Sequence, residues 1–200
     1  MTLDIVSHSG TQTQRLGARL GELLLGGELI LLEGQLGTGK TTFTQGLAQG
    51  MGITEMISSP TFTLLKEYRG QPRITSQTAQ DVEKRGATAT FMAPTSVQGP
   101  HLWRPSKGPA LFHFDLYRLD DPEEIVALGF EEYFENIYHS GVSVVEWAEK
   151  AGDLWPPEHL LIRLKVVSET KRGLMFVATG ARYCELVRQF QKNTYATVSS

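Results

Sequence analysis

Residues 34–41 of the chain read GQLGTGKT and match the phosphate-binding pattern G-x-x-x-x-G-K-[ST]. They directly follow an apolar run at residues 29–32, and residues 40–51 are predicted to form a helix, so the order strand, loop, helix is present. Glycines let such a loop turn its N–H groups toward an anion, which the N-terminus of the helix also faces. The sequence therefore predicts a phosphate-binding loop; the alternative is a chance match in a glycine-rich turn.

Two side chains at the end of this loop carry specific chemistry. Lys40 is expected to reach the β- and γ-phosphates of a nucleotide, and the Thr41 hydroxyl is expected to hold Mg²⁺. The remaining loop positions are expected to contribute mainly backbone amides. The predicted phosphate-binding residues are Gly34, Gln35, Leu36, Gly37, Thr38, Gly39, Lys40 and Thr41.

Composition indicates one soluble globular domain over residues 1–200. The chain is 40% hydrophobic and 20% charged, and its 200 residues are enough to bury a core without disulfides or metal. The single cysteine, Cys184, excludes an internal disulfide, and the five histidines are scattered without zinc-site spacing, so no structural metal is expected. There is no secretion signal and no apolar run of about 20 residues, the length that spans a bilayer. We therefore expect a cytoplasmic protein with no membrane contact.

The segment 69–109 differs from the rest of the chain. It holds six basic and two acidic residues, a net charge of +4, whereas the whole chain has −3. It is rich in Pro, Gly, Ser, Thr and Gln and has no sustained periodicity, which predicts a flexible insertion rather than a second domain. A solvated loop is the simpler interpretation because the basic residues are spread out; a nucleic-acid or protein contact is the alternative.

The rest of the chain alternates strand and helix patterns. Helices are predicted around Leu16 to Leu24, at 40–51, from Asp121 as N-cap to Gly129, and at 181–191, before a frayed tail at 194–200. Strands are predicted at 110–114, 142–145, 159–167 and 174–179, the last two around a turn at 171–173. This order predicts an α/β fold, a P-loop NTPase-like three-layer sandwich with a mainly parallel central sheet and late antiparallel strands.

Two acidic residues end apolar strands of this sheet. Asp115 and Glu146 are expected at the same carboxyl-end edge as the phosphate loop. An aspartate there can support the Mg²⁺ that Thr41 begins to hold, and a glutamate there can orient or deprotonate an attacking water. The alternative for each is a strand-end carboxylate that accepts hydrogen bonds from turn amides.

Four segments then match one family in order. They are residues 34–43, SPTFTL at 59–64, HFDLYRL at 113–119 and VEW at 145–147. On these segments the chain resembles the TsaE (YjeE) family over nearly its whole length outside the insertion. The resemblance implies an ATPase that serves N6-threonylcarbamoyladenosine formation at position 37 of tRNAs reading codons that begin with A. It also implies that the protein acts with the TsaD and TsaB proteins and meets tRNA through that complex.

The resemblance assigns roles to individual residues. Lys40, Asp115 and Glu146 would be catalytic, and Thr41, Asp115 and Glu146 would surround the metal. Thr42 would lie by the α-phosphate. Thr61 would act as a switch threonine, although a Ser-Pro-Thr turn is an alternative. The transfer also suggests Thr13 and Arg172 near the nucleotide, while Trp147 is expected either to wall the site, to touch a partner or to pack as a buried aromatic.

Other nucleotide-dependent functions are weighed against this one. A GTPase needs an Asn/Thr-Lys-x-Asp element, which the chain lacks, so adenine is favoured. A small-molecule kinase is the main enzymatic alternative, and it would need an acceptor pocket and an arginine-bearing lid. A nucleotide-dependent assembly module, in which hydrolysis is incidental, overlaps the ATPase interpretation.

Overall fold

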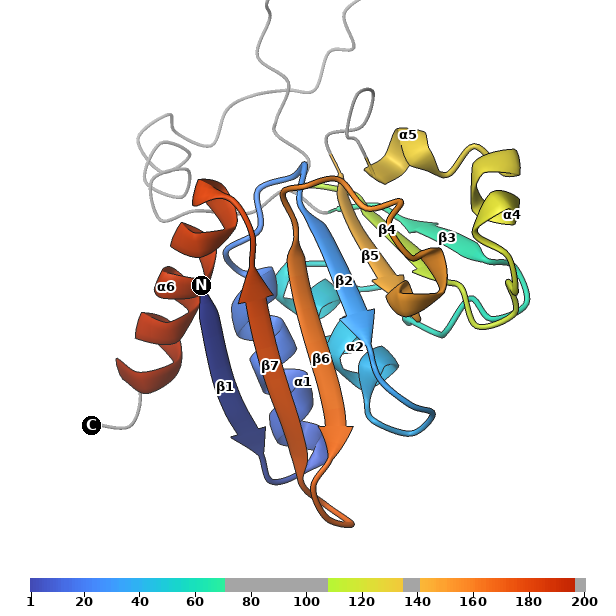
Figure 1. Ribbon diagram of the computed structural model, residues 1–200. Coiled ribbons are helices and arrows are strands. Elements are labelled where there is room, and N and C mark those ends of the chain that lie inside the picture. Colours follow the sequence, from blue (N-terminus) through green and yellow to red (C-terminus); the bar gives the residue numbers. More distant parts are fainter. Residues whose placement is uncertain (71–107, 135–140, 197–200) are drawn as a thin grey trace, which may run out of the picture.

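The computed structural model describes residues 1–70, 108–134 and 141–196, which form one seven-stranded sheet with helices on both faces (Figure 1). The strands are β1 (Thr2–Ser7), β2 (Leu29–Glu33), β3 (Leu65–Tyr68), β4 (Leu111–Asp115), β5 (Val142–Glu146), β6 (Leu160–Val166) and β7 (Arg172–Ala178). The helices are α1 (Gly10–Gly21), α2 (Lys40–Gly50), α4 (Pro122–Ala127), α5 (Glu131–Phe134), the 3₁₀ helix η1 (Ala148–Ala151) and α6 (Ala181–Ala196).

The centre of the sheet is parallel and its edges are antiparallel. The strand order is β1-β7-β6-β2-β5-β4-β3. Strand β2 pairs in parallel with β5 and β6, and β4 pairs in parallel with β5. Strand β7 is antiparallel to β6 and β1, and β3 is antiparallel to β4. The predicted α/β class, with a mainly parallel centre and late antiparallel strands, is confirmed.

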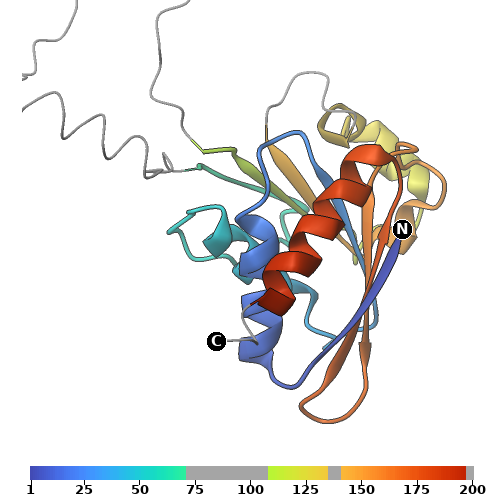
Figure 2. The same ribbon diagram turned by 90° about the vertical axis from the view of Figure 1, so that its left-hand side faces the viewer.

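Strand β2 lies in the middle layer of a three-layer structure. Its side chains alternate between the faces: Ile30 and Leu32 belong to an apolar cluster with α1, α2 and α6, while Leu29 and Leu31 belong to a second cluster with α4, α5 and η1. Figure 2 shows α1 and α6 on one side of the sheet. Burial on both faces explains why β2 is apolar at four successive positions.

Helices α1 and α2 approach each other closely through glycines. A Cβ added at Gly46 of α2 would overlap the Gln14 carbonyl oxygen of α1, and one added at Gly17 would overlap the Phe43 carbonyl oxygen. Because both obstacles are backbone atoms, no side-chain rotation relieves the overlap. This contact fixes the start of α2 against α1 and so helps to hold the phosphate loop in place.

We therefore expect Gly46→Ala to lower the free energy of unfolding. Overpacking typically costs about 1–3 kcal/mol, more than the roughly 1 kcal/mol that alanine gains in helix propensity. Urea unfolding measures the difference. Gly10→Ala is the matched control, because it also lies in a helix and its Cβ would meet nothing within 4 Å. Equal stability of the Gly46→Ala and parental proteins would contradict the close-packing argument.

The first helix differs from its predicted extent. It begins at Gly10 after the N-cap Ser9, whose hydroxyl accepts from the Gln12 N–H, and it ends at Gly21. Leu24 is buried although it lies beyond the helix. The Glu28 carboxylate accepts hydrogen bonds from the N–H groups of residues 25 and 26 and so stabilises a turn. This turn, rather than a helix, places Leu24 in the core.

Three further differences lie at the chain ends and in the last hairpin. Strand β1 was not predicted, and it forms because Thr2–Ser7 pairs with the distant β7. The predicted turn at 171–173 is wrong: Arg172 and Gly173 open β7, and the turn precedes them. Helix α6 continues through Ala196, so residues 194–196 are not a frayed tail. Arg19 of α1 donates to the Thr194 carbonyl at 3.1 Å, which ties this end to the domain.

The helix predicted from Asp121 is confirmed. Asp121 caps α4, its carboxylate accepts from the Glu123 N–H at 2.9 Å, and Glu124 completes a capping box. The helix ends at Ala127, and Gly129 follows with φ 69°. Residues 71–107 lie outside the described residues, so the flexible insertion stays a prediction; Tyr68 pairs with Leu111, which brings its two ends together at β3 and β4. No helix within the described ranges combines the length and apolarity that crossing a bilayer requires.

Candidate nucleotide site

The phosphate loop joins β2 to α2. Gly39 serves as the N-cap of α2 with φ 99°, a left-handed conformation that glycine adopts at little cost, and it supplies no side-chain cap. The first amides of α2 therefore remain available to an anion at the mouth of the helix. Thr38 stabilises the loop internally, because its hydroxyl donates to the Gln35 carbonyl at 2.8 Å.

Lys40 lies folded back inside this loop. Its Nζ donates to the carbonyl oxygens of Gly34 and Gln35 and lies 3.7 Å from the ring centroid of Trp147. Burial lowers the pKa of the Lys40 amine, while the charges of Glu146, Glu149 and Asp115 act in the opposite direction. The amine is thus held by main-chain carbonyls in a partly desolvated site, where an added phosphate would provide a strong counter-charge.

Thr41 and Glu146 form the centre of the site. The Thr41 hydroxyl donates to Glu146 Oε2 at 2.9 Å, from the first turn of α2 to the end of β5. Glu146 is 2% exposed, and its other oxygen, Oε1, lies 2.9 Å from His113 Nε2. The two ligand oxygens that a hard divalent cation would use here, a hydroxyl and a carboxylate, are therefore already adjacent.

Asp115 has different partners. Its Oδ2 accepts from the hydroxyls of Ser59 and Thr61, the latter at 2.7 Å, and its Oδ1 accepts from the Tyr117 N–H at 3.0 Å. It neighbours Glu146 in the β4–β5 register. The resemblance implied that Thr41, Asp115 and Glu146 surround the metal, with Asp115 supporting it and Glu146 acting on the water. In the structure Glu146 contacts Thr41, and Asp115 lies one strand farther away.

A hollow of about 410 Å³ gathers most of the predicted residues. It is lined by Leu36, Gly37, Gly39, Lys40, Thr41, Thr42, Ser59, Thr61, Asp115, Tyr117, Glu146 and Trp147. The residues of this hollow come from the loop after β2, the first turn of α2, the ends of β4 and β5 with the residues that follow them, and the segment before β3. These parts meet at one edge of the sheet. The expectation that the acids and the phosphate loop meet at this edge agrees with this geometry.

A second hollow, of about 340 Å³, adjoins the first and shares Gly37, Gly39 and Thr42 with it. Thr13 and Arg172, the two positions suggested by resemblance alone, both line it. The Arg172 guanidinium donates to the Gly37 carbonyl at 3.3 Å and to carbonyls of its own turn. Thr13 is buried and hydrogen-bonds the Ser7 hydroxyl at 2.7 Å. The arrangement therefore offers room for the part of a nucleotide that extends beyond its phosphates.

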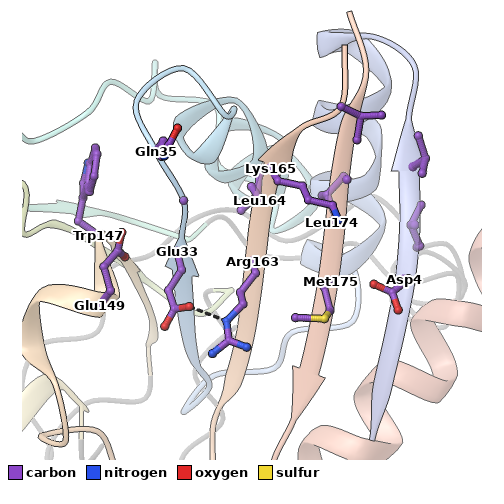
Figure 3. A pocket seen from close by; sticks show the side chains of 15 residues that line it. Asp4, Glu33, Gln35, Trp147, Glu149, Arg163, Leu164, Lys165, Leu174 and Met175 are labelled. Carbon is purple, nitrogen blue, oxygen red and sulfur yellow. Dashed lines mark hydrogen bonds and ion pairs between the residues drawn. The ribbon is translucent and has the colours of Figure 1, made fainter.

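A third hollow lies elsewhere on the sheet. Figure 3 shows it over β1, β7 and β6, with Gln35 and Trp147 at its border and the Glu33–Arg163 ion pair across it. Its volume is about 680 Å³. Gly34 and Gln35 line this hollow and not the one beside Thr41, so these two residues lie on the opposite side of the phosphate loop from Thr41. It lacks the convergence of carboxylates, hydroxyls and glycine amides that marks the smaller hollow.

Trp147 forms a wall of the site. It has φ 61°, the left-handed region that a non-glycine residue adopts only when its surroundings hold it there, and it precedes η1. Its ring lies over Lys40 and packs against Tyr117 with centroids 4.9 Å apart. Of the interpretations open from sequence, the wall of the site fits this position.

The donor set suits a magnesium ion accompanied by a nucleotide. Among the described residues, no group of three or more His, Cys, Asp and Glu side chains could hold a metal by itself. Mg²⁺ commonly takes only one or two protein ligands and completes its shell with phosphate oxygens and water. Thr41 and Glu146 fit that role, and a bound nucleotide would supply the remaining oxygens.

Three residues of the site were not assigned from the sequence. Ser59 and Tyr117 hold Asp115, and His113 holds Glu146. Strand alternation contained a signal for His113, because it lies two residues before Asp115 and so shares its face of β4. The N–H of Tyr117 acts through the backbone, which leaves no side-chain signature.

Comparison with known proteins agrees with these features. A family model described as "Threonylcarbamoyl adenosine biosynthesis protein TsaE" matches residues 7–79 and 82–174. The chain is 34% identical over 167 residues to the tRNA threonylcarbamoyladenosine biosynthesis protein TsaE of Bacillus subtilis, covering 84% of this chain and 80% of that protein. The protein of the same name from Treponema pallidum is 34% identical over 84% of this chain and 96% of its own length. A crystal structure of Bacillus subtilis YdiB matches with a TM-score of 0.67 and 28% identity, covering 97% of each chain.

Proposed function

The chain belongs to the TsaE family of threonylcarbamoyl adenosine biosynthesis proteins, and from this premise we propose that it is a Mg²⁺-dependent ATPase of that pathway. In this proposal it supports the formation of N6-threonylcarbamoyladenosine at position 37 of tRNAs that read codons beginning with A. It acts with the TsaD and TsaB proteins, which carry out the transfer, and meets tRNA through their complex. The cytoplasm is the proposed location.

The observation that carries the proposal is the hollow in which Lys40, Thr41, Asp115 and Glu146 converge on a glycine-rich loop. Lys40 and the loop amides would bind the phosphates, and Thr41 with Glu146 would hold the metal. Bound Mg²⁺ would supply charge to offset the negative charge that builds up on the phosphates. Asp115, which accepts from Ser59 and Thr61, is the second carboxylate and would orient a water for attack.

The second hollow supports the orientation of the nucleotide. Thr42 borders both hollows, which suits a position by the α-phosphate, between the phosphate chain and the nucleoside. Thr13 and Arg172 would then flank the nucleoside. Thr61 would sense the γ-phosphate. Its hydroxyl donates to Asp115, and a γ-phosphate could compete for that hydroxyl, as in switch residues of other nucleotide hydrolases.

Hydrolysis by the protein alone is expected to be slow. Arg172 reaches the loop at Gly37, but its guanidinium is bonded to main-chain carbonyls and points to the second hollow rather than to the γ-phosphate end. P-loop hydrolases without an arginine at the transferred phosphate turn over slowly until a partner supplies the missing charge or order. Within the part of the chain that the structure describes, no arginine lines the hollow of Thr41 and Glu146, which supports a component that would work at full rate only in an assembly.

Reconstitution with purified TsaD, TsaB and substrate tRNA tests the proposal. We expect ATP hydrolysis to be weak with this protein alone, to rise when TsaD and TsaB are added, and to accompany formation of the modified adenosine, scored by mass spectrometry of the tRNA. Equal hydrolysis with and without the partners would contradict it. Phosphate transferred from ATP to a small acceptor would instead identify a kinase.

A further inference from the structure

His113 lies directly behind the Glu146 carboxylate. The ring is fully buried, the Glu146 side chain is 3% exposed, and Nε2 lies 2.9 Å from Oε1. In the parallel β4–β5 pair, His113 sits opposite Val144 and Asp115 sits opposite Glu146, so the histidine is one alternation deeper than the two acids on the same face. It is therefore beneath the site rather than in it.

The two oxygens of Glu146 point to different places. Oε1 is engaged on the inner side by His113, and Oε2 accepts the Thr41 hydroxyl on the side of the hollow. An ionised carboxylate only accepts hydrogen bonds, so Nε2 carries the proton of the contact. The carboxylate is consequently held at one oxygen, while the other contacts Thr41 on the side where the metal and phosphates would bind.

Packing alone does not account for a histidine here. Nδ1 is buried and has no hydrogen-bond partner among the described residues, and leaving a buried polar atom unsatisfied costs stability. Its strand neighbours Phe112 and Phe114 are apolar, and the facing Val144 is apolar as well. An aliphatic residue at this position would avoid that cost, but it could not donate a hydrogen bond to Glu146.

We propose that His113 is the positioning residue of Glu146: its Nε2–H holds Oε1 so that Oε2 stays directed at Thr41 and the phosphate end of the hollow. This inference rests on the proposed function for its catalytic consequence, but the contact itself exists in the free protein. Partners behind a metal-binding side chain typically contribute about 10- to 100-fold to metal affinity or activity.

Two variants separate positioning from packing. His113→Leu fills the space without a donor, and His113→Gln keeps an N–H donor at a similar reach. In the reconstituted system we expect His113→Leu to lower kcat about 10- to 100-fold and to raise the Mg²⁺ concentration for half-maximal activity, with metal-free ATP binding nearly unchanged. His113→Gln should recover most of both losses. Phe112→Leu, on the other face of the same strand, is the control for destabilisation and should keep parental values.

A folded His113→Leu protein with parental kcat and Mg²⁺ dependence would overturn the inference, as would a His113→Gln protein impaired as much as His113→Leu. If the parent itself does not hydrolyse ATP, the proposed function fails. In that case ¹⁵N NMR of the histidine rings still tests whether His113 Nε2 donates to Glu146. We expect a protected Nε2–H for His113 in the free protein, with a resonance that shifts in Glu146→Ala. A parental His113 ring protonated only at Nδ1 would contradict the proposed contact. This result does not depend on whether the His113→Leu protein folds.

Discussion

Replacing Lys40 with alanine should abolish measurable ATP binding. The amine lies inside the loop, where it is partly desolvated and lines the hollow in which the phosphates would bind. Removing one partner of a desolvated, hydrogen-bonded charge pair costs about 2–5 kcal/mol. That loss raises Kd by about 30-fold or more. Calorimetric titration with ATP and Mg²⁺ measures it directly.

A thermal-shift experiment provides an independent readout. ATP that binds only the folded state raises Tm by mass action, so the parent should be stabilised by ATP and Lys40→Ala should not. Lys165→Ala is the matched control: this exposed lysine lines the hollow over β1, β7 and β6, which does not include Thr41. Unaltered ATP affinity in Lys40→Ala would remove the phosphate loop from the proposed function.

The phosphate loop could be identified from sequence because all of its parts are contiguous. A strand, a glycine-rich turn and a helix N-terminus follow one another within residues 29–51, and the geometry of the site is largely local. The edge position of Asp115 and Glu146 was also predictable, because each ends a buried strand and parallel strands end at a common edge. These predictions needed no knowledge of which strands are neighbours.

The different contacts of Asp115 and Glu146 could not be predicted without knowing which strands are neighbours. Strand β5 lies next to β2, and β4 lies one strand farther out, so Glu146 reaches Thr41 while Asp115 reaches Ser59 and Thr61. Lateral strand order is set by packing across the whole sheet and leaves no mark within either motif. The same limit explains β1 and the last turn of α6, which depend on β7 and on Arg19, both more than 150 positions away in the chain.

Replacing Glu146 with alanine should separate binding from turnover. The loop amides and Lys40 would still hold the phosphates, so ATP affinity should stay within a few-fold of the parent. Hydrolysis should fall by about 100-fold or more, because the variant lacks the carboxylate that would hold the metal with Thr41 and so loses charge stabilisation at the phosphates. The substitution removes the carboxylate that accepts the Thr41 hydroxyl and that His113 contacts from behind.

Single-turnover hydrolysis with partners present, measured beside equilibrium ATP binding, distinguishes the two effects. Glu149→Ala is a suitable control: this exposed carboxylate contributes to the charge around Lys40, as Glu146 does, but it lines the hollow on the sheet face rather than the one with Thr41. If the charge around Lys40 were the decisive quantity, both variants would lose activity alike. If contact with Thr41 is decisive, Glu149→Ala keeps most of its hydrolysis while Glu146→Ala does not, and parental hydrolysis by Glu146→Ala would exclude that carboxylate from the mechanism.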